Sequence, residues 1–481
     1  MNPRFASLAV AALLAGCAGM PPKPKPIVLP NEAPLAGLDA QGGGAWPSQD
    51  WWQRYQDPTL DALVALGLGS SPTLATARAR FDTARQSVRV AGAAAGVQVT
   101  AVGDIERQRL SDNGLFPPQL LGFTWYNQAD LGLQFSYTFD WWGKQRDLID
   151  AAMDEAHAAQ ADRSAAALLL TSSIADTYFG WQADQGRLAL AREREATVQR
   201  EGAIAAQRVR ADLDSEDSLR NADSALAAAR EQIATLEGSA KLRVVALAAL
   251  VGRSVADLPP LSPKPLPTVP SAIPDGVSLD LVARRADIAA SRWRIEAAEK
   301  NLDSARAEFY PDISINALAG LSSIDIGKLL EWSSRVPAAT AAIHLPIFDS
   351  GRLKAHYGAV QASIDSAVES YRETLVSAAR DVATQAATRA QLAAQRAQRA
   401  IESDAAGQLE ASAAARVRQG VVDPRAQLTA AEASIQQRDA LLQLDAATLS
   451  ADIALQRALG GGYDESAATA NSPKTSSTTA P

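Results

Sequence analysis

The sequence predicts a mainly helical protein with a small β part, built from two internal repeats. Three features support this prediction: an alanine-rich composition, a duplicated sequence pattern, and short stretches where apolar and polar residues alternate. The chain has 481 residues, of which 47% are hydrophobic but only 5% aromatic. Alanine favours helices and adds little volume to a core, so long, closely packed helices are expected rather than a bulky globular core.

The duplication is visible in matching segments of the two halves. Phe139-Asp140 and Phe348-Asp349 lie 209 positions apart, and Arg208-Val209-Arg210 matches Arg416-Val417-Arg418 at an offset of 208. Apolar residues at seven-residue spacing repeat with nearly the same offset. A consistent offset across separated segments indicates two repeats of similar length.

Each repeat is expected to contain a helix, two strands and two long helices. The first repeat, 51–258, has predicted helices at 58–95, 142–200 and 203–252 and predicted strands at 97–109 and 128–139. The second repeat, 278–459, has predicted helices at 278–308, 352–402 and 406–458 and predicted strands at 312–320 and 339–347. A proline-rich segment, 259–277, joins the two repeats.

The N-terminus predicts a secretory signal over residues 1–16. Arg4 precedes an apolar stretch too short to span a bilayer, and the stretch ends in Leu14-Ala15-Gly16-Cys17, which resembles a bacterial lipobox. In such signals the cysteine becomes the acylated first residue, although an ordinary signal with an incidental cysteine stays open. Residues 17–50 are expected to form a lipidated tether. Ala18, in place of an inner-membrane retention aspartate, favours the outer membrane.

The C-terminal segment and the charge balance complete the outline. Residues 460–481 are rich in Gly, Ser, Thr and Pro and are expected to be disordered. The net charge of −8 argues against nucleic acid as the main partner. Three scattered histidines and one cysteine favour neither a metal site nor a catalytic site, so the sequence predicts no enzyme and no cofactor.

The predicted strands alternate in polarity along their length. In 131–139 every second residue is large and apolar, and the residues between them are small or polar. A soluble, half-buried sheet gives the same pattern. Strands of 9–12 residues are, however, long enough to cross a bilayer when they are tilted. Trp residues lie near the strand ends, where aromatic belts occur. The polar face predicts lumen positions at Gln134, Ser136, Thr138 and Asp140.

Four strands cannot close a barrel, and an open sheet edge in lipid leaves backbone groups unpaired. The chain must therefore associate. Eight strands from two copies would be filled by side chains, whereas twelve strands from three copies would allow a pore. The apolar stripes of the helices fit either a coiled coil or an ordinary bundle core. A helix of about 55 residues, roughly 80 Å long, favours a tube that crosses the periplasm.

Four motifs are similar to those of a known family. They are Trp51-Trp52 with Pro58–Leu63, Ala286–Ala290 continuing to Pro311-Asp312-Ile313, Leu345-Pro346-Ile347-Phe348-Asp349-Ser350-Gly351-Arg352, and Arg416–Asp423. Together with Cys17 they resemble the TolC-like outer membrane efflux proteins, in particular the lipoprotein outer membrane factors of tripartite efflux systems. The resemblance covers residues 50–459.

The resemblance implies a homotrimer in which twelve transmembrane strands form one outer membrane barrel. The long coiled-coil helices then form a coaxial α-barrel that extends into the periplasm. The implied function is a passive, gated conduit that exports drugs or other small toxic compounds to the exterior. The implied partners are outer membrane lipid, a periplasmic adaptor protein and an inner membrane pump, here a proton-driven pump of the resistance–nodulation–division type.

The resemblance also places functional residues at the helical tip. Gate candidates are Asp212, Asp214, Asp217, Asp423 and Arg425, and adaptor-contact candidates are Arg208, Val209, Arg210, Arg416, Val417 and Gly420. Two departures from the family pattern stand out. Ala426 and Thr429 occupy positions where relatives carry constricting acids, and Asp212 replaces a glycine. A solvated turn is the alternative interpretation of these charges.

Two other functions stay open at this point. The exit channel of a type I protein secretion system shares the fold but works with an ATP-driven partner. A lipoprotein scaffold that bridges the envelope without conducting is the second alternative. The lipobox favours a drug or metal pump, and the alternating strands argue against a scaffold.

Overall fold

A computed structural model of the chain describes residues 22, 26–30, 45–268 and 282–465. The predicted signal peptide, Cys17, most of the tether and most of the tail lie outside these residues, as does part of the predicted inter-repeat segment. The described chain forms two compact units. One contains 22, 26–29, 81–158 and 291–370. The other contains residue 30 and residues 45–80, 159–268, 282–290 and 371–465.

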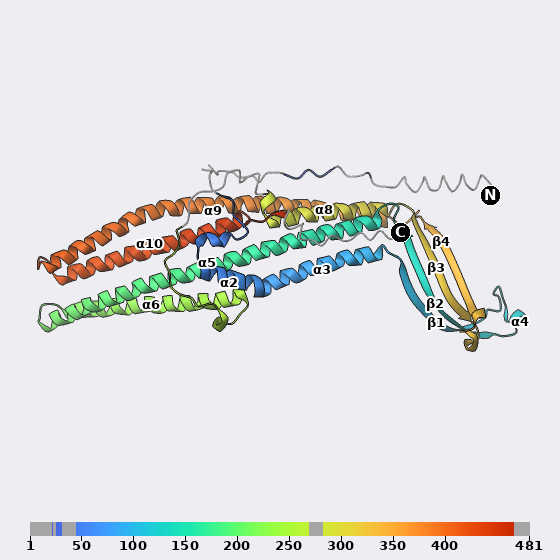
Figure 1. Cartoon of the computed structure of the whole chain (residues 1–481), viewed down its shortest axis with the longest axis horizontal. Helices are drawn as coiled ribbons and strands as arrows, with labels where there is room; N and C mark the ends of the chain where they lie inside the picture. The colour runs from blue at the N-terminus through green and yellow to red at the C-terminus, as the bar shows by residue number, and fades with distance from the viewer. Residues whose placement is uncertain (1–21, 23–25, 31–44, 269–281, 466–481) are drawn as a thin grey trace. The chain divides into compact units, whose positions relative to one another are not determined.

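The first unit is built around a four-stranded antiparallel sheet. Its strands are β1 (Gln98–Arg109), β2 (Trp125–Phe139), β3 (Asp312–Ser323) and β4 (Arg335–His344), in the order β1-β2-β3-β4 (Figure 1). The short helix α4 (Pro118–Leu121) lies in the β1–β2 connection. Two 3-10 turns, η4 (Ile326–Lys328) and η5 (Trp332–Ser334), lie in the β3–β4 connection.

All four strands differ from their predicted ranges: β1 begins one residue later than predicted, at Gln98, and β3 ends three residues later, at Ser323. Strand β2 begins at Trp125, three residues before the predicted start, and β4 spans 335–344 rather than 339–347. Pro346 has no backbone N–H and disfavours pairing at its end of the segment. Pro337 lies inside β4, which is tolerated because β4 is an edge strand of this sheet.

Two long helical hairpins follow the strands. The first is α5 (Lys144–Arg210) with α6 (Glu216–Val251), and the second is α9 (Arg352–Arg418) with α10 (Pro424–Ala458) (Figure 1). The predicted breaks near 201–202 and 403–405 were wrong, because both helices continue to the tip. Gly202 and Asp404 weaken a helix only modestly, and side-chain packing along a long helix outweighs such propensities.

The remaining helices are α2 (Pro58–Ser70), α3 (Pro72–Ala94) and α8 (Ala286–Ala307). The single helix predicted over 58–95 is therefore two helices. Ser71 is extended, with φ −62° and ψ 127°, as expected for a residue that precedes proline. Asp57 caps α2, because its carboxylate accepts a hydrogen bond of 2.9 Å from the Thr59 amide.

The duplicated motifs have matching structural roles. Helices α5 and α9 each contain 67 residues. Asp140 accepts hydrogen bonds from the amides of Gln145 and Arg146, and Asp349 accepts one from the amide of Leu353. The repeated Phe-Asp pair therefore marks the point where each strand gives way to a long helix, and its aspartate caps that helix.

The two tip turns are also equivalent. Asp212 has φ 56° and Gly420 has φ 70°. The next residue in each turn donates to the last turn of the preceding helix, Leu213 to Arg208 O at 2.9 Å and Val421 to Arg416 O at 3.0 Å. Both hairpins thus use the same left-handed C-terminal cap, with aspartate in the first repeat where the second has glycine.

The helical unit has a core that joins its N-terminal residues to both hairpins. Trp51, Trp52 and Tyr55 belong to the 3-10 helix η2 (Trp51–Tyr55) and are buried. The Tyr55 ring meets the Phe179 ring edge to face, with centroids 5.1 Å apart. The same cluster includes buried residues of α2, α5, α6 and α10, namely Leu60, Leu63, Val64, Ile174, Tyr178, Leu247, Val251, Leu449 and Ile453.

The left-handed turns yield a first prediction. A Cβ at Gly420 would meet no atom within 4 Å, so Gly420→Ala changes only the backbone energy. We expect it to destabilise the protein by about 1 kcal/mol, whereas Asp212→Gly should stabilise it by up to about 1 kcal/mol. Denaturant unfolding of the purified protein measures both changes. Destabilisation by Asp212→Gly would contradict the equivalence of the two turns.

Candidate functional site

The sheet has one polar and one apolar face, and the strand register shows which residues share each face. Paired residues of antiparallel strands project to the same side. Gln134 lies opposite Thr100 of β1 and Leu318 of β3, and Ser136 lies opposite Gln98 and Asn316. The apolar face of β2 is formed by the alternate residues Leu131, Leu133, Phe135, Tyr137 and Phe139.

The predicted lumen residues fall into two groups. Gln134, Ser136 and Thr138 lie within β2 on the polar face, and Thr138 is opposite Ser314. Asp140 lies one residue beyond the strand, and its carboxylate caps α5. His344, at the end of β4, lies opposite Asp312 on the polar face. The two faces therefore suit water on one side and lipid on the other.

The sheet is open at both sides within this chain. Strand β1 pairs only with β2, and β4 pairs only with β3, in the part of the chain that the structure describes. Each edge strand therefore presents a row of backbone N–H and C=O groups. Lipid cannot satisfy such groups, so a membrane-embedded sheet of this kind needs further strands at both edges.

At the tip, four charged residues connect the two hairpins. Arg208 at the end of α5 donates through Nε to Asp214 Oδ2 at 3.0 Å, and Arg425 of α10 approaches the same oxygen at 3.3 Å. Arg425 also pairs with Asp423 at 3.5 Å, and the Arg208–Asp423 separation is 3.8 Å. We call Arg208, Asp214, Asp423 and Arg425 the tip network.

The tip network lowers the pKa values of both aspartates. The hydrogen bond from Arg208, with the charges of Arg208 and Arg425, holds the pKa of Asp214 below its ordinary value. The backbone hydrogen bond from Arg425, followed by the same two positive charges, lowers the pKa of Asp423. Both carboxylates are therefore ionised at neutral pH, and both arginines have a charged partner.

The other predicted tip residues make local contacts. Asp217 pairs with Arg220 at 3.3 Å within α6, and its side chain is 80% exposed. Arg210 donates to Ala206 O and Arg416 donates to Ser412 Oγ, each one turn back on its own helix. Val209 and Val417 are half-buried, and Asp212 and Gly420 are exposed. The structure thus brings together Arg208, Asp214, Asp423 and Arg425, but not the remaining candidates.

Two buried polar networks in the helical unit were missed by the sequence analysis. In the first, Asp57 accepts hydrogen bonds from Tyr178 and Lys264, both at 2.8 Å, while Gln182 donates to Tyr178 and accepts from the Lys264 amide. Burial and the hydrogen bond to Asp57 raise the pKa of Tyr178 to about 12. This network fixes residues 262–264 against α2 and α5.

In the second network, Asp452 of α10 is fully buried. It accepts a hydrogen bond of 2.8 Å from the Tyr55 hydroxyl and pairs with Arg389 of α9 at 3.3 Å. Burial, followed by the charge of Asp452, raises the pKa of Tyr55. In the sequence, this pair is indicated only by an aspartate between the leucines Leu449 and Leu455 of one helix face, and that pattern does not reveal its partner.

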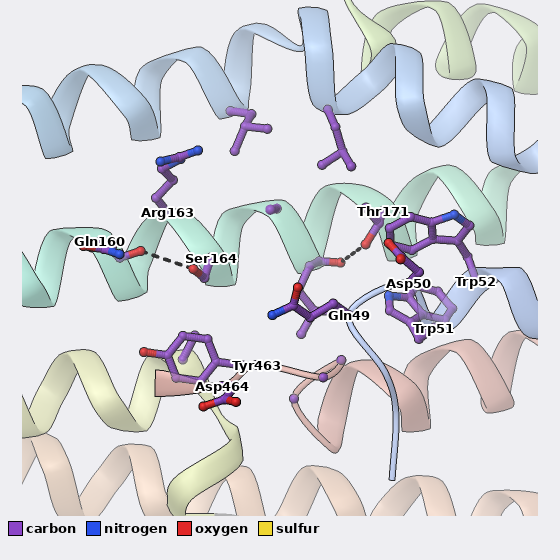
Figure 2. Close-up of a pocket in the computed structure, with 18 residues that line it drawn as sticks. Gln49, Asp50, Trp51, Trp52, Gln160, Arg163, Ser164, Thr171, Tyr463 and Asp464 are labelled. Atoms are coloured by element: carbon purple, nitrogen blue, oxygen red, sulfur yellow. Dashed lines mark hydrogen bonds between the residues drawn. The ribbon is translucent and has the colours of Figure 1, made fainter. Parts of the chain in front are cut away.

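A cavity of about 580 Å³ is lined by Trp51 and Trp52 of η2 and by residues of α5. Figure 2 shows Gln49, Asp50, Trp51 and Trp52 on one side of it, Gln160, Arg163, Ser164 and Thr171 on another, and Tyr463 and Asp464 on a third. Ser164 and Thr171 donate to carbonyls of their own helix. The cavity therefore lies between residues 49–52, α5 and residues 460–464, without a convergent set of catalytic groups.

No helix in the described part of the chain combines the length and apolar character needed to cross a bilayer. Among the described residues, no group of three or more His, Cys, Asp or Glu side chains is placed to hold a metal ion.

The fold, the two-faced sheet and the long hairpins define a transport protein of the outer membrane channel class. The family model of the outer membrane efflux proteins matches residues 63–253 and 278–461. The chain belongs to this family. The family comprises channels rather than enzymes, and it locates the protein in the outer membrane, as the sequence predicted.

Individual relatives are similar to this chain over most of its length. The multidrug resistance outer membrane protein MdtP of Shigella flexneri is 32% identical over 466 residues, which are 95% of each chain. The outer membrane protein VceC of Vibrio cholerae is 31% identical, with a TM-score of 0.77 over 87% of this chain and 100% of its own. The Campylobacter jejuni channel CmeC, 20% identical, shares the fold with a TM-score of 0.83 over 93% and 95%.

Proposed function

We propose that this outer membrane efflux protein is a homotrimeric, gated, passive conduit for drugs or other small toxic compounds. The observation that carries the proposal is the open four-stranded sheet with one polar and one apolar face. Three copies supply twelve strands, and the diameter of a barrel grows with its strand number, so that twelve strands allow a pore where eight would be filled by side chains. Gln134, Ser136 and Thr138 then line the lumen, and the apolar face contacts lipid.

The proposed partners follow from the need for an energy source. A passive conduit exports against a gradient only if a pump feeds it, so the helical tip contacts a periplasmic adaptor that links it to a proton-driven inner membrane pump. Arg210, Arg416, Val417 and Gly420 are exposed or half-buried at the tip and are available for that contact, with Arg208 and Val209 beside them. The naming of MdtP for multidrug resistance favours this proposal over a protein secretion channel.

Cys17 is proposed to carry the lipid anchor. Its position at the end of a short apolar stretch supports this assignment. Two or three acyl chains hold a protein stably at a membrane surface, whereas one does not. The anchor adds to the barrel rather than replacing it.

The proposed gate is the tip network. It ties the turn of the first hairpin to the turn of the second within one protomer, through Asp214 and its two arginine partners. Three such tips around one axis would narrow the periplasmic end. Breaking these ion pairs would let the two hairpins separate. An adaptor would break them by offering its own charged groups to the same residues.

The function is tested in the cells that make this protein. Deletion of the gene should increase ethidium accumulation and sensitivity to toxic small molecules, and the wild-type chain should restore both. A protonophore, added while ATP is maintained, should abolish the restored efflux. Export that survives the protonophore, or loss of a secreted protein on deletion without any change in ethidium efflux, would favour the type I secretion channel instead.

The gate is tested by single-channel recording of the purified trimer in planar bilayers. Asp214→Asn removes the carboxylate that both arginines share, so we expect the open probability to rise several-fold. Asp217→Asn is the matched control, because this exposed residue of the same turn pairs only within its own helix.

The network should also set the pH dependence. Because the pKa values of Asp214 and Asp423 are lowered in the folded protein, their stabilisation is complete above the ordinary carboxylate pKa near 4 and is lost as the pH falls below it. The open probability of the wild-type channel should therefore rise as the pH falls below about 4. Equal effects of Asp214→Asn and Asp217→Asn would contradict this gate.

A further inference from the structure

The charged residues of the strands are separated by face. Asp104, Glu106, Asp130 and Asp312 all lie on the polar face, as the pairs Asp104–Asp130 and Asp312–His344 indicate. Arg107 and Arg109 lie on the opposite face of β1, and Arg335 lies opposite Leu321 on the apolar face. Every Asp and Glu of the four described strands thus shares one face, and every Arg shares the other.

The three arginines also lie at one end of the sheet. Arg107 and Arg109 are within the last three residues of β1, and Arg335 is the first residue of β4. All three are therefore beside the β1–β2 and β3–β4 connections, at the end of the strands away from helices α5 and α9. On a face that contacts lipid, an arginine is favourable only near the boundary of the hydrocarbon region. There its guanidinium can extend to the polar headgroups.

Aromatic rings accompany these arginines. The Arg107 guanidinium lies 5.6 Å from the centre of the Trp125 ring, and the Arg335 guanidinium lies 4.5 Å from the Trp332 ring. Trp125 is 53% exposed and Trp332 is 78% exposed. A guanidinium stacked on an indole is oriented with its N–H groups still available at the edge. Arg109 shares one of its N–H groups with Asp112 at 3.3 Å.

Large exposed apolar residues continue the surface into the connections. They include Phe116, Leu120 and Phe123 after β1 and Ile324, Ile326 and Leu330 after β3. Apolar side chains, indole rings and guanidinium groups at the same end of the sheet match the three parts of a lipid boundary: acyl chains, interface and anionic headgroups.

We propose that Arg107, Arg109 and Arg335, with Trp125 and Trp332, form a binding surface for the phosphate groups of a phosphorylated glycolipid in the outer leaflet. Arginine binds phosphate through paired N–H donors, and two arginines two residues apart on one strand are about 7 Å apart. The proposal rests on the proposed orientation of the sheet, with its polar face to the lumen and its connections outside the cell.

The test measures lipid retention by the full-length purified trimer. Native mass spectrometry would count bound molecules of diphosphoryl lipid A, of its dephosphorylated form and of phosphatidylglycerol, each added at matched concentration. The test variant combines Arg107→Gln, Arg109→Gln and Arg335→Gln. The control variant combines Arg78→Gln, Arg80→Gln and Arg89→Gln, three exposed arginines of α3.

The wild-type protein and the α3 control should bind diphosphoryl lipid A at least tenfold more tightly than the test variant. Removal of the phosphates should lower wild-type binding to the level of the test variant. Equal binding by test variant and wild type would overturn the proposal, and so would equal wild-type binding of phosphatidylglycerol. Ethidium efflux, measured in the same strains, separates a failure of this surface from a failure of the conduit function.

Discussion

The unpaired edges of the sheet constrain the rest of this structure. Strands β1 and β4 each offer one side of backbone N–H and C=O groups without partners in the described chain. In lipid each such group costs several kcal/mol, so a single copy cannot remain embedded. The edges therefore make assembly a condition of insertion. The alternating side chains then determine which face of the sheet is exposed to water and which face contacts lipid.

Each long hairpin begins shortly after a strand, at α5 after β2 and at α9 after β4. Asp140 and Asp349 cap the long helices directly after a strand, so the change from strand to helix occurs at a defined residue in each repeat. Further along, Asp452 with Arg389 and Tyr55 ties both helices of the second hairpin to the N-terminal η2. Removing one partner from such a buried pair is costly, so the pair holds the second hairpin against the aromatic core around η2.

Much of the fold could be predicted from the sequence because its signals are local. Alternation in 131–139 identified the strand and its faces, and the paired Phe-Asp motifs identified the repeat. The ends of the helices were harder to predict from the sequence. The predicted breaks near 201–202 and 403–405 do not occur, because packing along the long helices outweighs local propensity, and Pro72 divides the helix that was predicted as continuous over 58–95.

The site residues show the same limit. The tip was located from its motifs, but which charges pair depends on the contact between hairpins more than 200 residues apart, as in Arg425 with Asp214. Asp140 satisfies the alternation that predicted a lumen residue, yet its backbone partners lie in α5. The Asp57–Lys264 pair joins segments about as far apart in the chain. Periodicity identifies faces, whereas ion-pair partners emerge only from the tertiary structure.

The most direct test of this account is the accessibility of alternate positions along β2 in the outer membrane. Single cysteines at Leu133, Gln134, Phe135 and Ser136 would be exposed to a water-soluble, membrane-impermeant maleimide in whole cells. The account predicts rapid labelling at 134 and 136 and protection at 133 and 135, because only the polar face meets water. Equal labelling at all four positions, or labelling at 133 and 135 alone, would contradict it.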